Sequence, residues 1–322
     1  MIKSKIDKIL RAHNLSPVKI LALSTGKFNN SFYVELENHS SHENIPAKKI
    51  IIRVAPDPGN VNLFYENSMM LQEPGIIQMV GKNTSIPVPE IYVFDTSESV
   101  IPNHYMIMEC IEGTPMSEAF LSNNREQMII RKIGEYLREL HDTIHSSQFG
   151  YLGEHKPMKP ANSWKEAFST MWSLLIDDIS RCKVYDDMEK KLALDAFTKH
   201  VDLFDFSNKA PLLHMDIWSQ NIILGDDNEI AAIIDWDRAL WGDPEIEFAV
   251  LDYVGFNTPA FWEGYGAKPE ENRESKIKGM FYHLYEVQKY LVIWTLRRKG
   301  YHNRVQNYRE YSINLLNKLL LK

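Results

Sequence analysis

The sequence has little cysteine, no long apolar run and no excess of basic residues. Cys110 and Cys182 are the only cysteines among 322 residues, too few for a disulfide framework, and neither has the paired spacing of a metal site. No stretch of about 18 apolar residues predicts a membrane-spanning helix. A formal charge of -7 argues against nucleic-acid binding, which favours a basic surface. These absences predict a protein of the reducing cytoplasm with neither membrane nor nucleic acid as a partner.

What is present is typical of an ordered globular chain. Hydrophobic residues make up 44% and charged residues 25%, and the length predicts one large or two modest cores. Within the first 110 residues, apolar and β-prone segments separated by turn residues predict five strands. Two of them lie within 18–36, and the others within 47–56, 86–95 and 104–113. A helical pattern over 62–80 interrupts this series.

Long helical patterns dominate the rest of the chain. The segment 124–145 places Ile129, Ile133, Leu137 and Leu140 on one helical face, which we interpret as core. Residues 162–200 and those after about 275 are also predicted to be helical. The expected fold class is therefore α+β with two lobes. A β-rich lobe of residues 1–108 is joined by a hinge at 109–113 to a helical lobe of residues 114–322.

The segment "LLHMDIWSQNIIL", residues 212–224, carries the clearest chemical pattern. Asp216 follows His214 by two residues and precedes Asn221 by five. The apolar runs "NIIL" and "EIAAIID" flank the turn "GDDN", which predicts a β-hairpin with Asn221 and Asp235 at the same end. This spacing matches phosphoryl transfer in protein kinases, where an aspartate accepts the proton of an attacking hydroxyl while an asparagine and a second aspartate bind magnesium.

Several segments together resemble one known family. "LLHMDIWSQNIIL" is similar to the catalytic loop of the aminoglycoside phosphotransferase family, also called the aminoglycoside/choline kinase-like family. "AAIIDWDRALWGDPEIEFA" resembles its metal-binding segment, "STGKFNNSFYVEL" its phosphate loop and "MIMECIEGTPM" its hinge. The resemblance covers nearly the whole chain and implies a bilobal protein-kinase-like fold. It also implies ATP or GTP as co-substrate with Mg²⁺.

The resemblance assigns roles to individual residues. Asp216 would be the catalytic base, Asn221 and Asp235 would hold magnesium, and His214 would brace the loop. The nucleotide would contact eight further positions, namely Gly26, Asn30, Ser31, Arg53, Glu73, Met108, Glu109 and Ile111. Trp218 is read equally as a substrate contact and as core, whereas Trp236 and Trp241 are read as core.

Arg53 departs from the protein-kinase pattern, which has lysine on the third strand. Arginine also occurs there in the family, and its forked donors can hold a diphosphate. Its helix partner is left open between Glu66 and Glu73, because Pro74 disfavours helical geometry for the residue before it.

The expected activity is transfer of a nucleotide γ-phosphate to a small-molecule hydroxyl. An aminoglycoside-like or other amine-bearing acceptor is the leading class, with antibiotic resistance as its associated role, and a fructosamine-type sugar amine is the alternative. Thirteen acidic residues against three basic ones in 225–275 favour a cationic acceptor. A catalytically inactive binding module is the alternative from another class.

Overall fold

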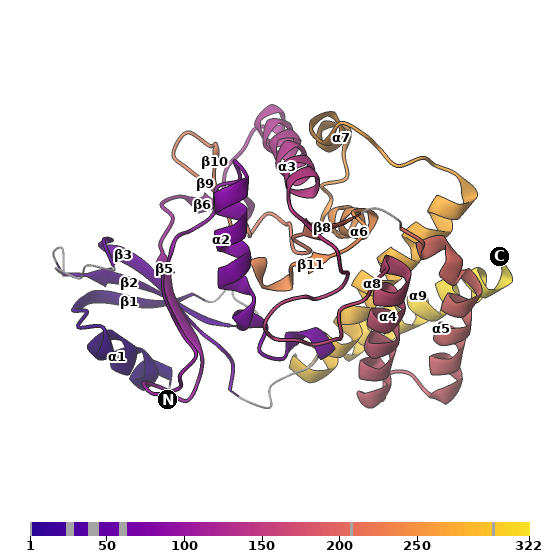
Figure 1. The fold of residues 1–322 in the computed structure, drawn as a ribbon, viewed down its shortest axis with the longest axis horizontal. Coiled ribbons are helices and arrows are strands. Elements are labelled where there is room, and N and C mark those ends of the chain that lie inside the picture. Colours follow the sequence, from indigo (N-terminus) through magenta and orange to yellow (C-terminus); the bar gives the residue numbers. More distant parts are fainter. Residues whose placement is uncertain (1, 24–28, 38–44, 58–62, 207–208, 298–299) are drawn as a thin grey trace.

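The computed structural model describes residues 2–23, 29–37, 45–57, 63–206, 209–297 and 300–322. Its first part is a five-stranded antiparallel sheet in the order β1-β2-β3-β5-β4 (Figure 1). The strands are β1 (Pro17–Leu23), β2 (Asn30–Leu36), β3 (Lys49–Val54), β4 (Ile91–Asp95) and β5 (Tyr105–Glu109). The strands expected from the apolar pattern are therefore confirmed.

Alternation along β3 sends its side chains to two different faces of the sheet. Ile50 and Ile52 join the core beneath helix α1 (Ile2–Ala12), which contributes Ile6 and Ile9. Arg53 has the opposite parity and contacts the start of helix α2 (Glu73–Asn83). The period of two in "IIIRV" therefore places one charged side chain on the face that is turned away from α1.

The expected helix over 62–80 is only partly correct. The chain forms two short 3₁₀ helices, η1 (Phe64–Glu66) and η2 (Met69–Leu71), before α2 begins at Glu73. Ser68 adopts a left-handed conformation with φ of 53°, which interrupts a continuous helix. Pro74 is accommodated in the first turn of α2, where its missing N–H removes no helical hydrogen bond.

The helical patterns of the second part are confirmed. Ile129, Ile133, Leu137 and Leu140 of the predicted helix are all buried. The helices are α3 (Asn123–Thr143), α4 (Trp164–Arg181), α5 (Asp187–His200), α6 (Glu245–Val254), α7 (Pro259–Tyr265), α8 (Arg273–Arg297) and α9 (His302–Leu321). Among the described residues, no helix has both the length and the apolar character needed to cross a membrane.

Two small sheets hold the segment that carries the chemical pattern. Strand β8 (Ala210–Leu213) lies between β7 (His145–Ser146) and β11 (Leu240–Trp241). Strands β9 (Ile222–Leu224) and β10 (Ile230–Ile233) form the expected hairpin, beside β6 (Thr114–Pro115). The loop from His214 to Asn221 is therefore anchored to a sheet at each end.

Candidate active site

His214 braces the loop that carries Asp216. Its Nδ1 accepts a hydrogen bond from the backbone N–H of Asp216 at 3.1 Å, so Nε2 is left to donate to the Ile234 carbonyl at 3.2 Å. Burial lowers the pKa of His214, which favours this neutral form with one donor and one acceptor. His214 therefore joins the loop to the hairpin, which is the bracing role that the sequence suggested.

Both carboxylate oxygens of Asp216 are held. Asn221 Nδ2 donates to the Asp216 carbonyl at 2.9 Å and to Oδ2 at 3.1 Å, while Arg238 Nη1 donates to Oδ1 at 2.9 Å. The Ile234 N–H donates to the Asn221 carbonyl at 3.0 Å, which brings Asp235 to the same end of the hairpin. The structure therefore gathers Asp216, Asn221 and Asp235 at one place.

Arg53 approaches this group from the sheet. Its guanidinium contacts Glu73 at 2.5 Å, Asp235 at 2.8 Å and Asp237 at 3.5 Å. Glu66 instead pairs with Arg297 and accepts from the N–H of Leu63. The open choice of a partner for Arg53 is thus decided in favour of Glu73.

Glu73, Asp235 and Asp237 place carboxylate oxygens within 4.8 Å of one another. Burial raises the pKa of Glu73 to about 6 despite Arg53, and burial also raises the pKa of Asp237. A single guanidinium cannot neutralise three carboxylates, so further positive charge would be favourable here. Hard oxygen donors suit Mg²⁺. The residues present therefore fit a divalent cation.

Of the residues expected to hold the nucleotide, Ser31 and Met108 lie on the same face of the sheet as Arg53. Asn30 and Ser31 begin β2, and Ser31 pairs in register with Arg53. Gly26 lies outside the described residues. Met108 is buried on β5, Glu109 is the last residue of that strand, and Ile111 follows just beyond it.

Comparison with known proteins decides the family. The model of the family described as "Phosphotransferase enzyme family" matches residues 72–275, which is more than half of the chain. The chain belongs to the phosphotransferase enzyme family. This match confirms the resemblance that the catalytic and metal-binding segments indicated.

Two curated relatives are distant in sequence. The probable acyl-CoA dehydrogenase IBR3 of Arabidopsis thaliana is 23% identical over 276 residues, which cover 80% of this chain and 32% of that protein. The probable ketoamine kinase YniA of Escherichia coli K12 is 22% identical over 198 residues, which cover 59% of this chain and 62% of that protein. The match thus spans less than two thirds of either relative.

Solved structures show the fold of this phosphotransferase family member. A protein from Haemophilus somnus 129PT, provisionally assigned as a fructosamine-3-kinase, has a TM-score of 0.65 at 19% identity and covers 98% of this chain and 96% of its own. Aminoglycoside phosphotransferase APH(4)-Ia has a TM-score of 0.63 at 16% identity, covering 99% and 98%. A mutant of APH(4)-Ia has been solved as a ternary complex with AMP-PNP and hygromycin B. The α+β, bilobal protein-kinase-like fold expected from the sequence is confirmed.

A buried network behind the loop that carries Asp216 was not foreseen from the sequence of this family member. Glu247 Oε1 accepts from the N–H of Met215 at 2.6 Å, and Glu247 Oε2 lies 2.8 Å from His141 Nε2. His141 Nδ1 lies 3.0 Å from the Tyr265 hydroxyl. Met215 has a φ of 64°, which is strained for a side chain of its size. The network therefore holds a strained residue next to Asp216.

Four polar residues around the Asp235 turn were also missed. Gln72 donates to the carbonyls of Asp237 and Ala239, which fixes the turn from the start of α2. Asn29 donates to Asp237 Oδ2 at 3.3 Å. Asp237 and Arg238 lie within the "DWDR" segment quoted from the sequence, but the kinase pattern assigns a role only to its first residue. The signal available in the sequence was that Asp237 and Arg238 follow Asp235 by only two and three residues.

The acidic residues of 225–275 do not form one open surface. Asp243 pairs with Lys278 at 2.8 Å, Glu247 belongs to the buried network, and Asp252 accepts from Asn257 at 2.6 Å. Asp235 and Asp237 face Arg53. Part of the local charge imbalance that motivated a cationic acceptor is therefore compensated by ion pairs inside the protein.

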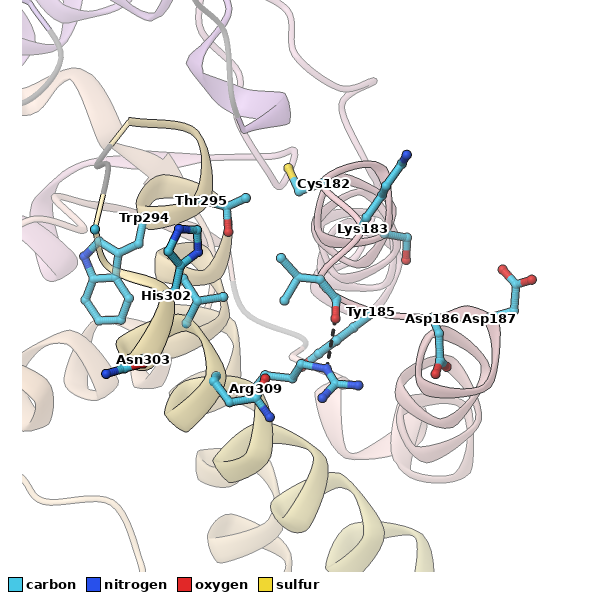
Figure 2. A pocket seen from close by; sticks show the side chains of 15 residues that line it. Cys182, Lys183, Tyr185, Asp186, Asp187, Trp294, Thr295, His302, Asn303 and Arg309 are labelled. Atoms are coloured by element: carbon cyan, nitrogen blue, oxygen red, sulfur yellow. Dashed lines mark hydrogen bonds between the residues drawn. The ribbon is translucent and has the colours of Figure 1, made fainter.

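A cavity of about 1090 Å³ lies among helices α4, α5, α8 and α9. Figure 2 shows it between the turn that joins α4 to α5 and the junction of α8 with α9. Arg309 donates across it to the Val184 carbonyl at 3.0 Å. Asp216 is not among its lining residues. The ring of Trp294, in the cavity wall, packs on the ring of Tyr290, with 5.2 Å between the ring centres.

Proposed function

We propose that this member of the phosphotransferase family transfers the γ-phosphoryl group of ATP or GTP to a hydroxyl of a small molecule. The observation that carries the proposal is the convergence of Asp216, Asn221 and Asp235 opposite the Arg53–Glu73 pair. This arrangement provides a base for the acceptor hydroxyl and charged groups for the phosphates.

Asp216 accepts the proton of the attacking hydroxyl in this proposal. Asn221 and Arg238 hold its carboxylate by hydrogen bonds, so its orientation is set before the acceptor arrives. Asn221 and Asp235 are the proposed ligands for Mg²⁺, which would neutralise charge on the transferring group. Arg53 donates to the nucleotide phosphates, and Glu73 orients its guanidinium.

The nucleotide is proposed to lie between a small lobe, residues 1–108, and a large lobe, residues 114–322. Gly26, Asn30 and Ser31 would contact its phosphates, and Met108, Glu109 and Ile111 its base at a hinge of residues 109–113. The end of the five-stranded sheet at Glu109 supports this division. We place the reaction in the cytoplasm, in keeping with free Cys110 and Cys182.

Amine-bearing hydroxyl compounds are the acceptors that the relatives favour. The name of the Escherichia coli relative specifies a ketoamine, and one APH(4)-Ia complex contains the aminoglycoside hygromycin B. An aminoglycoside-like acceptor would imply antibiotic resistance, whereas a sugar amine would imply a metabolic role.

A phosphorylation screen tests the proposal. The purified chain would be incubated with magnesium and either ATP or GTP, in the presence of antibiotics, sugar amines and other hydroxyl metabolites. Transfer that disappears in Asp216→Asn is the expected result. An inactive binding module would bind nucleotide yet show neither transfer nor magnesium-dependent hydrolysis, and that outcome would replace the kinase proposal.

A further inference from the structure

The segment between β3 and β4, residues 63–87, packs into the core of the helical lobe. Its buried apolar side chains share one hydrophobic core with α3, α4 and α8, and they are Leu63, Tyr65, Met69, Ile76, Ile77, Val80 and Ile86. The core beneath α1 is built instead from residues of 2–54 and 92–107. Two separate cores therefore meet between the sheet and the 63–87 segment.

The beginning of the 63–87 segment is anchored to two helices of the helical lobe. The N–H of Phe64 donates to a carboxylate of α4 at 2.6 Å. Glu66 pairs with Arg297 at the end of α8, and the Lys289 ammonium of the same helix lies 5.7 Å from the ring centre of Tyr65. Glu66 is only 1% exposed, and a buried carboxylate that loses its cation is costly, so this ion pair resists separation.

The end of the 63–87 segment is held by the helical lobe as well. The N–H of Ser85 donates to Glu139 of α3 at 2.6 Å. The carbonyl of Pro87 accepts from the N–H of Ile233, on β10, at 2.9 Å. With Gln72 already bonded to the Asp235 turn, the segment has polar contacts to the helical lobe at its beginning, middle and end.

The apolar contact between the 63–87 segment and the sheet is rich in methionine. Met70, next to α2, packs with Met106 and Met108 of β5, and all three are buried. In the sheet, Met106 lies opposite Arg53 and Met108 opposite Ile51, so these methionines occupy the face turned away from α1. Methionine is unbranched and adapts to changes in packing. This contact therefore tolerates a shift of the sheet against α2 better than the aliphatic core beneath α1 would.

Arg53 reaches across the boundary between the two cores. It belongs to β3 of the sheet, whereas its three carboxylate partners, Glu73, Asp235 and Asp237, lie in α2 and in the turn after β10. A movement of the sheet away from α2 would separate the guanidinium from all three partners. The arrangement in the structure, with Arg53 on Glu73, is therefore the closed one.

We propose that the protein moves as two bodies divided at this boundary. The smaller body is the five-stranded sheet with α1, and the larger body is the helical lobe together with the 63–87 segment. The inference rests on the proposed function for its purpose: the sheet closes over the nucleotide while α2 stays in place beside the metal-binding residues, and closure brings Arg53 onto Glu73. It redraws the small lobe of residues 1–108 expected from the sequence, because α2 lies within that range and does not move with the sheet.

Hydrogen exchange in two matched variants tests the division without any ligand. Ile52→Val removes one methyl group from the core beneath α1, and Ile133→Val removes the same group from the core of the helical lobe. Each substitution should speed the exchange of the slow amides of its own body by about three- to tenfold. The amides of α2 should therefore follow α3 in Ile133→Val and keep their wild-type rates in Ile52→Val, in which β2 and β3 exchange faster.

The exchange rates of α2 decide between the two assignments. If α2 exchanges faster in Ile52→Val and not in Ile133→Val, the helix belongs to the sheet body and the proposal is wrong. If both substitutions speed α2 and the sheet equally, the protein is one cooperative unit and the proposal is equally wrong.

Distances between spin labels test the movement itself. Labels would be attached in pairs at exposed positions of β1, α2 and α5 through Lys19→Cys, Lys82→Cys and Lys191→Cys, with Cys110 and Cys182 replaced by serine. Pulsed electron paramagnetic resonance would compare the protein with and without magnesium and AMP-PNP. The distance from β1 to α2 should change on addition of the nucleotide, whereas the distance from α2 to α5 should stay the same.

The opposite pattern, a constant distance from β1 to α2 with a changed distance from α2 to α5, would overturn the proposal. Constant distances in every pair of a protein that binds AMP-PNP would overturn it too, because the sheet would then not move. A wild-type protein that fails to bind magnesium and AMP-PNP in calorimetry would contradict the proposed function instead, and hydrogen exchange would still decide the division into two bodies.

Discussion

Glu247 accepts a hydrogen bond of 2.6 Å from the backbone N–H of Met215, the residue that precedes Asp216. Burial alone would raise the pKa of Glu247, but the hydrogen bonds from His141 and Met215 outweigh burial and lower it below its usual value. The carboxylate is therefore ionised inside the protein, and its two oxygens connect α3 and α6 to the loop that carries Asp216. The position of Asp216 therefore depends on residues of α3 and α6 that lie outside its own loop.

Glu247→Ala should both destabilise the protein and slow turnover. The substitution leaves His141 and the Met215 N–H without their buried partner, so we expect a loss of about 3–5 kcal/mol in the free energy of unfolding. Denaturant titration measures this loss. Glu263→Ala removes an exposed glutamate of α7 and should change stability by no more than about 0.5 kcal/mol. Similar stabilities for the two variants would show that the network is not a support.

Arg53 should matter for its shape as well as its charge. Arg53→Ala exposes Glu73 and Asp237 to each other without compensation, so the nucleotide KM should rise, turnover should fall and stability should decrease. Arg53→Lys should retain part of the activity, because the charge persists while the forked geometry is lost. Arg131→Ala on the exposed face of α3 is the control for loss of an arginine. Unchanged nucleotide kinetics in Arg53→Ala would return this residue to a structural role.

His155 should make the protein less stable in mild acid. Its ring nitrogens are buried without partners among the described residues, and burial lowers its pKa to about 4. The unfolded chain, with a histidine pKa near 6.5, binds the proton first, so stability is lost as pH falls from about 6.5 towards 4. Between about pH 7.5 and pH 5, protonation of this histidine in the unfolded chain should lower the free energy of unfolding by about 2 kcal/mol.

Denaturant unfolding of His155→Leu at both pH values checks that linkage. The variant should lose most of this part of the pH dependence, since it has no group to protonate at that position. His302→Leu, at an exposed histidine of α9, should keep the wild-type dependence. A wild-type dependence that persists in His155→Leu would assign the acid sensitivity to other groups.

Local patterns predicted the strands of the large sheet and the β9–β10 hairpin. Alternation in "IIIRV" and the turn "GDDN" between two apolar strands are short-range signals, and the structure reproduces both elements. The start of α2 was harder, because Pro74 suggests a boundary after Glu73, whereas the helix tolerates proline in its first turn. The choice between Glu66 and Glu73 therefore depended on three-dimensional contacts.

The supporting residues could not be predicted because their partners are remote in sequence. His141 and Glu247 are separated by 106 positions, and each occupies an unremarkable place on an amphipathic helix. Lys289 looks like an ordinary charged residue of α8 until the fold places it against Tyr65. Burial of a polar side chain leaves no periodic signal, so these roles appear only when distant elements are packed together.

The most direct test of the account compares Asp216→Asn with Asp235→Ala. Asp216 is proposed to act on the acceptor, so its variant should lose about 10²–10⁴-fold in turnover while magnesium–nucleotide affinity stays within about threefold of wild type. Asp235 is a proposed magnesium ligand, so its variant should lose that affinity as well as turnover. Calorimetric titration of magnesium–nucleotide, with turnover measured in parallel, gives both numbers. Near-wild-type turnover in Asp216→Asn, or wild-type nucleotide affinity in Asp235→Ala, would contradict the account.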